Sequence, residues 1–125
     1  MTSTNFKIVD RQYSTCDKDI TMTAGDTLAF GIEIGDQDGA PMDVDSVTFI
    51  AKDNYRSAFA DLFVKTLGSG ITREDTGIYS IRVAPSDTAQ ASGYFNYAVR
   101  VGVGDDVFTV MKGLLTIQTK VYEHT

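Results

Sequence analysis

The sequence of 125 residues contains one cysteine, one histidine and no tryptophan. Cys16 has no second cysteine with which to form a disulfide inside the chain. A single cysteine and a single histidine, His124, do not make a zinc ligand set, and no histidine is placed to activate a nucleophile. We therefore expect a protein that is not an enzyme and that holds no cofactor.

The sequence also has no excess of basic residues and no long apolar run. Its formal net charge is −6, and a field of that sign repels phosphates, so we expect no nucleic-acid partner. No run approaches the roughly 20 apolar residues of a membrane-spanning helix. Residues 1–6 lack the basic start and the apolar stretch of a secretory signal. We expect synthesis in the cytoplasm without a signal peptide, and no membrane partner.

Short segments in which apolar and polar residues alternate are abundant. In residues 27–34 every second side chain from Leu28 onward is apolar, which is the pattern of a strand with one face on a core. Residues 46–53 repeat the pattern, and we expect Val47, Phe49 and Ala51 to face the core. Further strands are predicted at 6–8, 20–23, 61–67, 78–83, 93–101 and 107–118. Turns rich in glycine and aspartate separate them, so we predict an all-β sandwich of seven or eight mainly antiparallel strands.

The chain is short enough to form one domain and long enough to bury its own core. We predict a single β-sandwich domain over residues 1–125, with its core at 20–118, an N-terminal strand and loop at 1–19 and a tail at 119–125. Within the last strand, Gly113 stands between two apolar sets on opposite faces, which predicts a β-bulge there. The Gly-Ser-Gly sequence at 68–70 predicts a flexible break.

The stretch 84–101 predicts a corner of the sandwich. A proline and a Ser-Asp-Thr cluster end one strand, a short polar or helical crossing follows, and Gly93 begins the next strand. In immunoglobulin-like sandwiches, a tyrosine at the start of the penultimate strand bonds back to this crossing. Tyr79 matches the local pattern D-x-G-x-Y, but two further strands would follow it where the fold has room for one. We therefore assign the corner to Tyr94 and Gly93, with the Tyr94 hydroxyl within reach of the backbone of 85–92.

Four aspartates lie within ten residues, and calcium is the ion that such a set would hold. They are Asp36, Asp38, Asp43 and Asp45. If Gly39 takes the place of the glycine in an EF-hand loop, the first ligand position falls on Ile34, and no helices flank the loop. An Asp-Gly dipeptide is also typical of a hairpin turn. We therefore favour an acidic hairpin turn and keep the four aspartates as weak candidates for calcium.

Three aromatic residues, Tyr55, Phe59 and Phe63, lie in or beside residues 54–60, where the alternation breaks. An exposed group of aromatics would form a protein interface or a platform for a sugar. The simpler interpretation is that these rings cover the open end of the sandwich. We keep them as candidate interaction residues.

The order of the strand and turn motifs resembles that of a known family. The motifs are Ile20-x-Met22-x-x-Gly25-Asp26-Thr27-Leu28, Asp36-x-Asp38-Gly39-Ala40-Pro41-Met42-Asp43, Ile78-Tyr79-Ser80-Ile81-x-Val83, Gly93-Tyr94-x-x-Tyr97 and Lys112-Gly113-Leu114-Leu115. Over roughly residues 20–118 they resemble the immunoglobulin-like domains of tailed-phage and prophage structural proteins, of the kind found at the N-terminus of baseplate upper proteins. The resemblance implies an immunoglobulin-like β-sandwich and a non-enzymatic module that docks into a multi-subunit tail or baseplate assembly.

The same resemblance implies protein partners, either further copies of the chain or other virion subunits, in an oligomeric assembly within the virion. The chain stops after the sandwich, without the receptor-binding region of a full baseplate upper protein. A small accessory or decoration protein of the virion is therefore also expected. The alternative is a carbohydrate-binding or adhesive immunoglobulin-like module of a bacterial surface, which would require an exposed aromatic platform.

Overall fold

The computed structural model describes residues 3–8, 16–35, 38, 40–53 and 61–119. Strands dominate these residues, which confirms the prediction of an all-β, sandwich-like fold. The strands are β1 (Ser3–Ile8), β2 (Cys16–Asp17), β3 (Ile20–Thr23), β4 (Leu28–Ile34), β5 (Ser46–Lys52), β6 (Asp61–Leu67), β7 (Gly70–Asp75), β8 (Ile78–Val83), β9 (Gly93–Val103) and β10 (Asp106–Gln118). A short helix, α1 (Pro85–Thr88), occupies the crossing predicted after β8. No helix in the described residues has the length and apolar character needed to cross a membrane.

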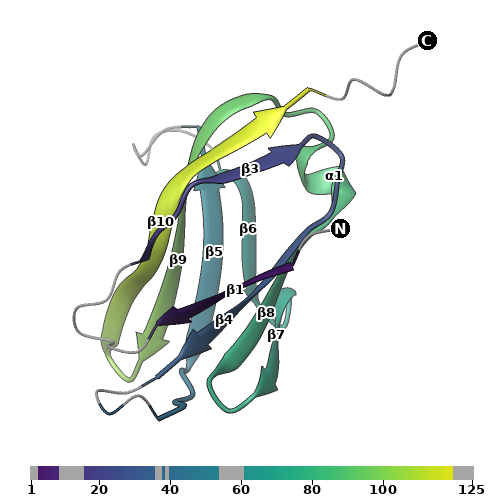
Figure 1. Ribbon diagram of the computed structural model, residues 1–125. Coiled ribbons are helices and arrows are strands. Elements are labelled where there is room, and N and C mark those ends of the chain that lie inside the picture. Colours follow the sequence, from purple (N-terminus) through teal and green to yellow (C-terminus); the bar gives the residue numbers. More distant parts are fainter. Residues whose placement is uncertain (1–2, 9–15, 36–37, 39, 54–60, 120–125) are drawn as a thin grey trace.

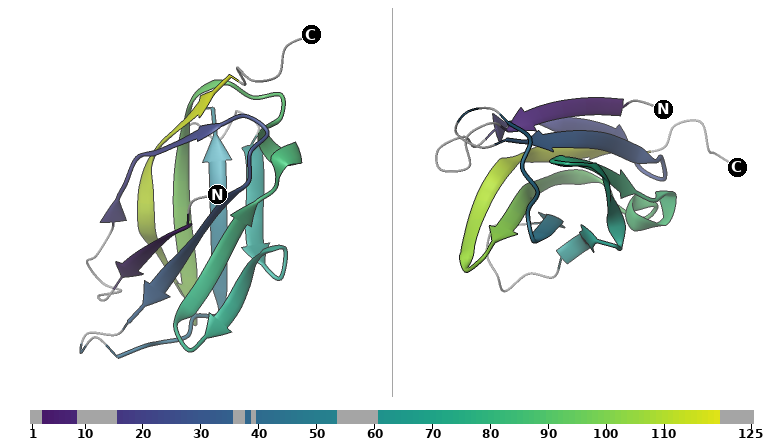
Figure 2. Two further views of the ribbon diagram at one scale, coloured as in Figure 1. Left: turned by 45° about the vertical axis from the view of Figure 1, so that its right-hand side comes forward. Right: turned by 90° about the horizontal axis from the view of Figure 1, so that it is seen from below.

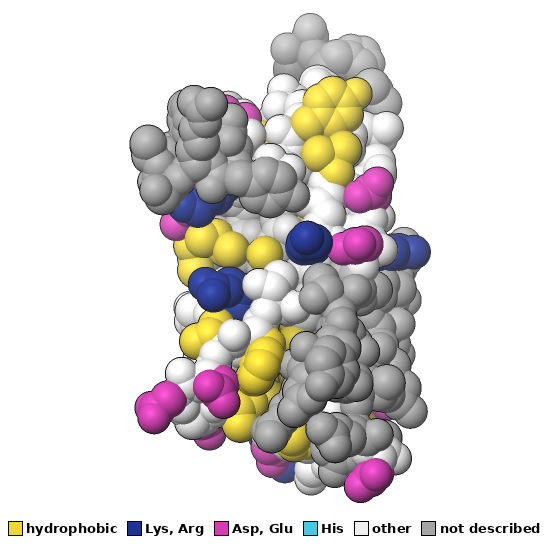
Figure 3. Space-filling view, turned by 90° about the vertical axis from the view of Figure 1, so that its left-hand side faces the viewer, with side chains coloured by type: hydrophobic (Ala, Val, Ile, Leu, Met, Phe, Trp, Pro, Cys, Tyr) yellow, Lys and Arg dark blue, Asp and Glu magenta, His cyan; other side chains and the backbone are white. Residues whose placement is uncertain are grey.

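The strands form one mixed sheet in the order β1-β4-β8-β7-β6-β5-β9-β10-β2, and β3 also pairs with β10. The sheet folds over on itself (Figures 1 and 2), so that β1, β4, β8 and β7 make one layer and β6, β5, β9 and β10 make the other. The two layers join where β6 pairs with β7. In this parallel pairing Thr66 lies opposite Gly70, and Leu67 lies opposite Ile71. On the side formed by β10, hydrophobic and charged side chains are interspersed (Figure 3).

The sheet has ten strands, more than the seven or eight predicted. The two-residue β2 is too short to leave a sequence pattern. The predicted flexible break at residues 68–70 is a tight turn that leads into β7, because the Gly68 N–H donates to the Ile71 carbonyl at 2.8 Å. All but one of the side chains of β7 are exposed and mostly polar, so this strand shows no alternation of apolar residues.

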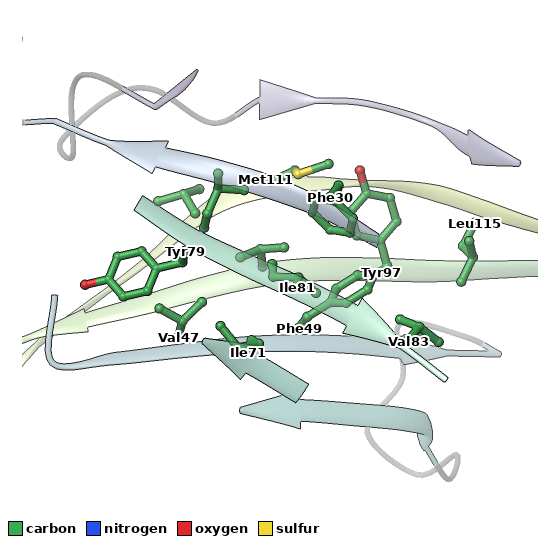
Figure 4. Packing of buried hydrophobic residues seen from close by; sticks show 14 of the residues in the cluster. Phe30, Val47, Phe49, Ile71, Tyr79, Ile81, Val83, Tyr97, Met111 and Leu115 are labelled. Carbon is green, nitrogen blue, oxygen red and sulfur yellow. The ribbon is translucent and has the colours of Figure 1, made fainter. Parts of the chain in front are cut away.

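The alternation in β4, β5 and β8 predicted their buried faces correctly. Val47, Phe49 and Ala51 of β5 are at most 1% exposed. The inward side chains of the other two strands are Phe30, Ile32 and Ile34 of β4 and Tyr79, Ile81 and Val83 of β8. These residues pack between the two layers and form the centre of a single hydrophobic core (Figure 4).

An aromatic cluster lies at the middle of this core. The ring of Phe49 meets the rings of Phe30, Phe63 and Tyr97 edge to face, with centroids 5.5, 5.3 and 5.5 Å apart. Edge-to-face contacts of this kind add to the stabilisation that burial alone provides. Because the four residues come from β4, β5, β6 and β9, the cluster joins both layers.

The irregularity of β10 lies before the predicted bulge at Gly113. The register with β9 shifts between Thr109 and Met111, and the adjacent side chains of Val110 and Met111 are both buried. The prediction of a bulge at Gly113 was wrong because the apolar face already switches at residues 110–111. Position 113 requires a glycine for another reason, because a Cβ there would clash with the carbonyl oxygen of Lys18. The segment before β3 therefore lies directly against β10.

Tyr94 does not form the predicted corner. Its side chain is 70% exposed, because Tyr97 and Val99 are inward residues of β9 and the pleat turns Tyr94 outward. Tyr79 is the buried tyrosine of the two, and its hydroxyl accepts a hydrogen bond from the backbone N–H of Val44 at 3.0 Å. Tyr79 thus anchors the β4–β5 connection rather than the crossing after β8.

Candidate interaction surfaces

The aspartates predicted as weak calcium candidates tie separate loops together. Asp36 lies outside the described residues, and Asp38 is exposed. Asp45 accepts a hydrogen bond from the Gly104 N–H at 2.7 Å, which ties the β4–β5 connection to the β9–β10 turn. Asp43 instead contacts the β7–β8 turn. In the part of the chain that the structure describes, no group of three His, Cys, Asp or Glu side chains could hold a metal ion.

Asp43 is the centre of a hydrogen-bond network. Its Oδ1 accepts hydrogen bonds from Nε of Arg73 at 3.1 Å and from the Gly77 N–H at 2.8 Å, and the Tyr79 hydroxyl donates to it at 3.4 Å. The Arg73 hydrogen bond, and then that from Gly77, hold the pKa of Asp43 below its ordinary value. Burial raises the pKa of Tyr79. This hydrogen-bond network fixes the β4–β5 connection against the β7–β8 hairpin.

Replacing Asp43 with asparagine is expected to lower the free energy of unfolding at neutral pH and to matter less as the pH falls. The folded-state pKa of Asp43 is depressed below the unfolded value of about 4. Its stabilisation is therefore present above that value and is lost as the pH falls through the folded pKa. The effect is modest because the Arg73 and Asp43 side chains are 47% and 46% exposed, so water screens the pair.

Urea unfolding of the parent and of D43N, from neutral pH to about pH 2, measures whether the difference in their free energies of unfolding shrinks as the pH falls. Asp105→Asn removes one charge from the exposed β9–β10 turn and serves as the control for net charge. A stability difference between the parent and D43N that stays constant across the range would contradict the role of the ionised carboxylate.

The three aromatic candidates do not form a described platform. Phe63 is 6% exposed and packs on Phe49 in the core, so its prediction as an interaction residue was wrong. The alternation of β6 turns Phe63 inward, and proximity to the irregular segment obscured that pattern. Tyr55 and Phe59 lie in residues 54–60, outside the described residues. Gly93 is the first residue of β9 and is exposed.

Among the described residues, large exposed hydrophobic side chains lie on the outer face of the layer that contains β5 and β9. The large hydrophobic side chains that stand exposed in the described residues are Val64, Leu67, Tyr94 and Val107. They lie on β6, β9 and β10, and the pleat turns Val64, Tyr94 and Val107 to the outside of this layer. The outer face of β4 and β8 instead carries small and charged side chains, among them Gly31, Glu33 and Arg82. The two outer faces thus differ in character.

Three rows of outward side chains run across β6, β5, β9 and β10, and we call them the four-strand face. The rows are Val64–Ile50–Ala98–Lys112, Thr66–Thr48–Arg100–Thr109 and Asp61–Lys52–Asn96–Leu114. Cross-strand neighbours in such rows touch one another, so the apolar and threonine side chains form a continuous surface. Sequence reasoning missed this face. The signal was the apolar residues at outward positions, such as Ile50 and Leu114, in strands whose inward side is already apolar.

The four-strand face also carries positive charge. Lys52 and Asp61 neutralise each other in an ion pair of 3.1 Å. Arg100 and Lys112 are exposed, lie in adjacent rows on neighbouring strands, and belong to none of the ion pairs among the described residues. Exposed Asp17 of β2 lies beside Lys112 at the edge of the face, so the net positive charge is small and is centred on Arg100. Viewed from the β10 side, basic side chains cross the middle of the molecule with acidic side chains beside them, and further acidic side chains lie at its lower end (Figure 3). Arg100 and Lys112, on a chain of net charge −6, favour contact with an acidic surface.

A groove of about 540 Å³ lies between the start of β6, the helix α1 and the start of β9. Leu62, Ala91 and Phe95 supply its apolar lining, and Asp53, Asp61 and Asp87 supply carboxylates. Two of the three carboxylates are already engaged, Asp61 with Lys52 and Asp87 with Lys65 at 2.7 Å. The Lys65–Asp87 pair thus fixes α1 to β6 and reduces the capacity of the groove to bind a cation.

No protein-family model matches the sequence, and no curated protein matches it. Similar folds occur among solved structures. The N-terminal domain of phage TP901-1 ORF48 is similar to this chain with a TM-score of 0.50 and 12% sequence identity, over 94% of this chain and 99% of that chain. An endo-fucoidan hydrolase from glycoside hydrolase family 107 is similar with a TM-score of 0.48 and 7% identity, over 90% of this chain and 14% of that chain.

At such low sequence identities, these similarities show the fold alone. The hydrolase carries no argument about this chain, because its TM-score is below 0.5 and the chain spans only 14% of its length. The phage domain matches over nearly the whole of both chains. This chain therefore has the fold of a phage protein domain of nearly the same extent.

Proposed function

We propose that this chain is a structural module of a phage or prophage virion, of the tail or baseplate type or an accessory protein, and that it acts through protein–protein contacts without catalysis. The observation that carries the proposal is the similarity to the N-terminal domain of phage TP901-1 ORF48 across 94% of this chain. It agrees with the sequence resemblance to structural proteins of tailed phages, which rests on separate motifs.

The order of strand pairing supports the immunoglobulin-like part of this proposal. In an immunoglobulin sandwich, the second strand pairs with the fifth, which pairs with the fourth, and the third pairs with the sixth, which pairs with the seventh. Here β4 pairs with β8 and β8 with β7, while β5 pairs with β9 and β9 with β10. These six strands pair as their immunoglobulin counterparts do, which supports this part of the proposal.

The four-strand face is the surface through which we expect the module to dock. It combines exposed Val64 with partly exposed Ile50 and Ala98 in one row. Protein interfaces place apolar side chains at their centre and polar side chains at their rim. The threonine row and the flanking cations supply that polar surround. The partners are further copies of the chain or other virion subunits.

Mass spectrometry of gradient-purified phage particles tests the proposed function. We expect peptides of this chain in amounts comparable to those of other structural proteins. Val64→Glu puts a charge into the middle of the four-strand face and is expected to reduce incorporation on the order of tenfold or more, since buried unpaired charges disrupt interfaces.

Thr72→Glu is the matched control, because it introduces the same side chain at an exposed strand position in the other layer. Its incorporation should equal that of the parent chain. Particles that lack the chain altogether would overturn the proposed function. Equal incorporation of the two variants would remove the four-strand face from it.

A further inference from the structure

We propose that the four-strand face binds the acidic end of a second copy of this chain, so that copies join head to tail. This inference rests on the proposed function and names the partner of its docking face. The acidic end comprises the connections 40–45, 75–77 and 104–106, which contain no lysine or arginine of their own. The one basic side chain paired with it among the described residues is Arg73 of β7, which neutralises Asp43. Its described aspartates are Asp43, Asp45, Asp75, Asp105 and Asp106.

The acidic end is a preformed surface, because hydrogen bonds join its three connections. Asp43 accepts from the Gly77 N–H at 2.8 Å, and Asp45 accepts from the Gly104 N–H at 2.7 Å. The Asp45 N–H in turn donates to the Gly102 carbonyl at 2.7 Å. A surface that is ordered before binding loses less conformational entropy when it docks.

The charges of the two surfaces favour one of the ways in which two copies could associate. Two four-strand faces packed about a two-fold axis would bring the same patch, with Arg100 and Lys112, against itself. Like charges brought together disfavour that arrangement. The acidic end offers the opposite charge, with Asp105 and Asp106 exposed at its tip. The complementary contact is therefore between unlike surfaces.

The two surfaces occupy separate parts of the molecule. The acidic end lies where β4, β7 and β9 finish, at the foot of Figure 1, whereas the four-strand face runs along the sides of β6, β5, β9 and β10. One copy can therefore donate its end and accept another end at the same time. Contacts between unlike surfaces of this kind generate rings or helical arrays rather than closed dimers.

The contact is weak between free chains and sensitive to salt. Exposed ion pairs contribute little each, and their field falls off over about 8 Å at physiological ionic strength. Val64 in the face and Tyr94, the outward residue of β9 next to Asn96 at the edge of the face, are both exposed and supply apolar contact. Association is therefore expected at high protein concentration and is expected to weaken as salt is added.

Analytical ultracentrifugation of two charge-reversal variants tests the inference. The face variant is R100E/K112E, and the end variant is D105K/D106K. The parent chain should show an average mass that rises with concentration from micromolar to millimolar and passes that of a dimer. Each variant alone should associate on the order of tenfold or more weakly. An equimolar mixture of the two should regain growth beyond a dimer, because the acidic end of the face variant meets the unchanged face of the end variant, and the reversed end of the latter meets the reversed face of the former.

Arg82→Glu, a charge reversal on the exposed outer side of β8, is the control and should associate like the parent. Circular dichroism and thermal unfolding establish that each variant is folded. A parent chain that stays monomeric, variants that associate like the parent, or a mixture that holds only monomers would each overturn the head-to-tail contact. If the chain is present in virions and yet monomeric, the contact fails and the proposed function stands. If the chain associates head to tail and is absent from virions, the proposed function fails instead.

Discussion

Replacing Phe49 with alanine is expected to lower the free energy of unfolding by about 3–5 kcal/mol, as is typical when a buried aromatic ring is removed. Phe49 is fully buried and contacts the rings of Phe30, Phe63 and Tyr97. Removal of the ring leaves a cavity between the two layers, and both layers would have to shift to close it. Urea unfolding followed by circular dichroism measures the change.

Val64→Ala is the control for the Phe49 substitution, since it truncates an exposed strand residue in the same sheet. It should change stability by less than about 0.5 kcal/mol. A loss of less than about 1 kcal/mol for Phe49→Ala would mean that the aromatic cluster is not the centre of the core.

Replacing Gly77 with alanine is expected to destabilise the fold by about 2–5 kcal/mol, because it combines backbone strain with overpacking. Gly77 has a φ of 72°, and a Cβ there would lie 2.6 Å from the Ile34 carbonyl oxygen and 2.8 Å from the Met42 nitrogen. Both neighbours are backbone atoms, so neither can rotate away. The shift would also disturb the hydrogen bond from Gly77 to Asp43.

Gly68→Ala separates the two causes. Gly68 has a φ of 91°, and no atom lies within 4 Å of the position that a Cβ would take. Alanine there meets the backbone strain alone, which costs about 1–2 kcal/mol. Thermal or urea unfolding of both variants gives the comparison. Equal losses at the two positions would show that the close approach of Ile34 and Met42 to Gly77 is unimportant for stability.

The inward faces of the strands were predictable from the sequence because a strand has a period of two. Phe30, Val47 and Ile81 follow that rule, and all three are buried. The same rule, applied strictly, would have turned Tyr94 outward and Phe63 inward. In both cases a local motif or a neighbouring irregular segment was given more weight than the period of the strand.

Other features were beyond sequence reasoning because they depend on distant segments. The partner of Tyr79 is Val44, 35 residues away, and the partner of Asp43 is Arg73, 30 residues away. Nothing near Gly113 in the sequence indicates that the backbone of Lys18 lies against it. The four-strand face likewise exists only once the pairing order has brought β6, β5, β9 and β10 together.

The parallel pairing of β3 with β10 has a mechanical consequence. Ile20 to Thr23 pair with Leu115 to Gln118 in parallel register, and the Ala24 N–H continues the ladder by donating to the Gln118 carbonyl at 2.8 Å. In this arrangement, tension pulling backward on the start of β3 and forward on the end of β10 loads the ladder in shear. Its hydrogen bonds must then break together rather than one after another. The β3–β10 ladder therefore resists tension of this direction more strongly than a ladder whose hydrogen bonds open one at a time.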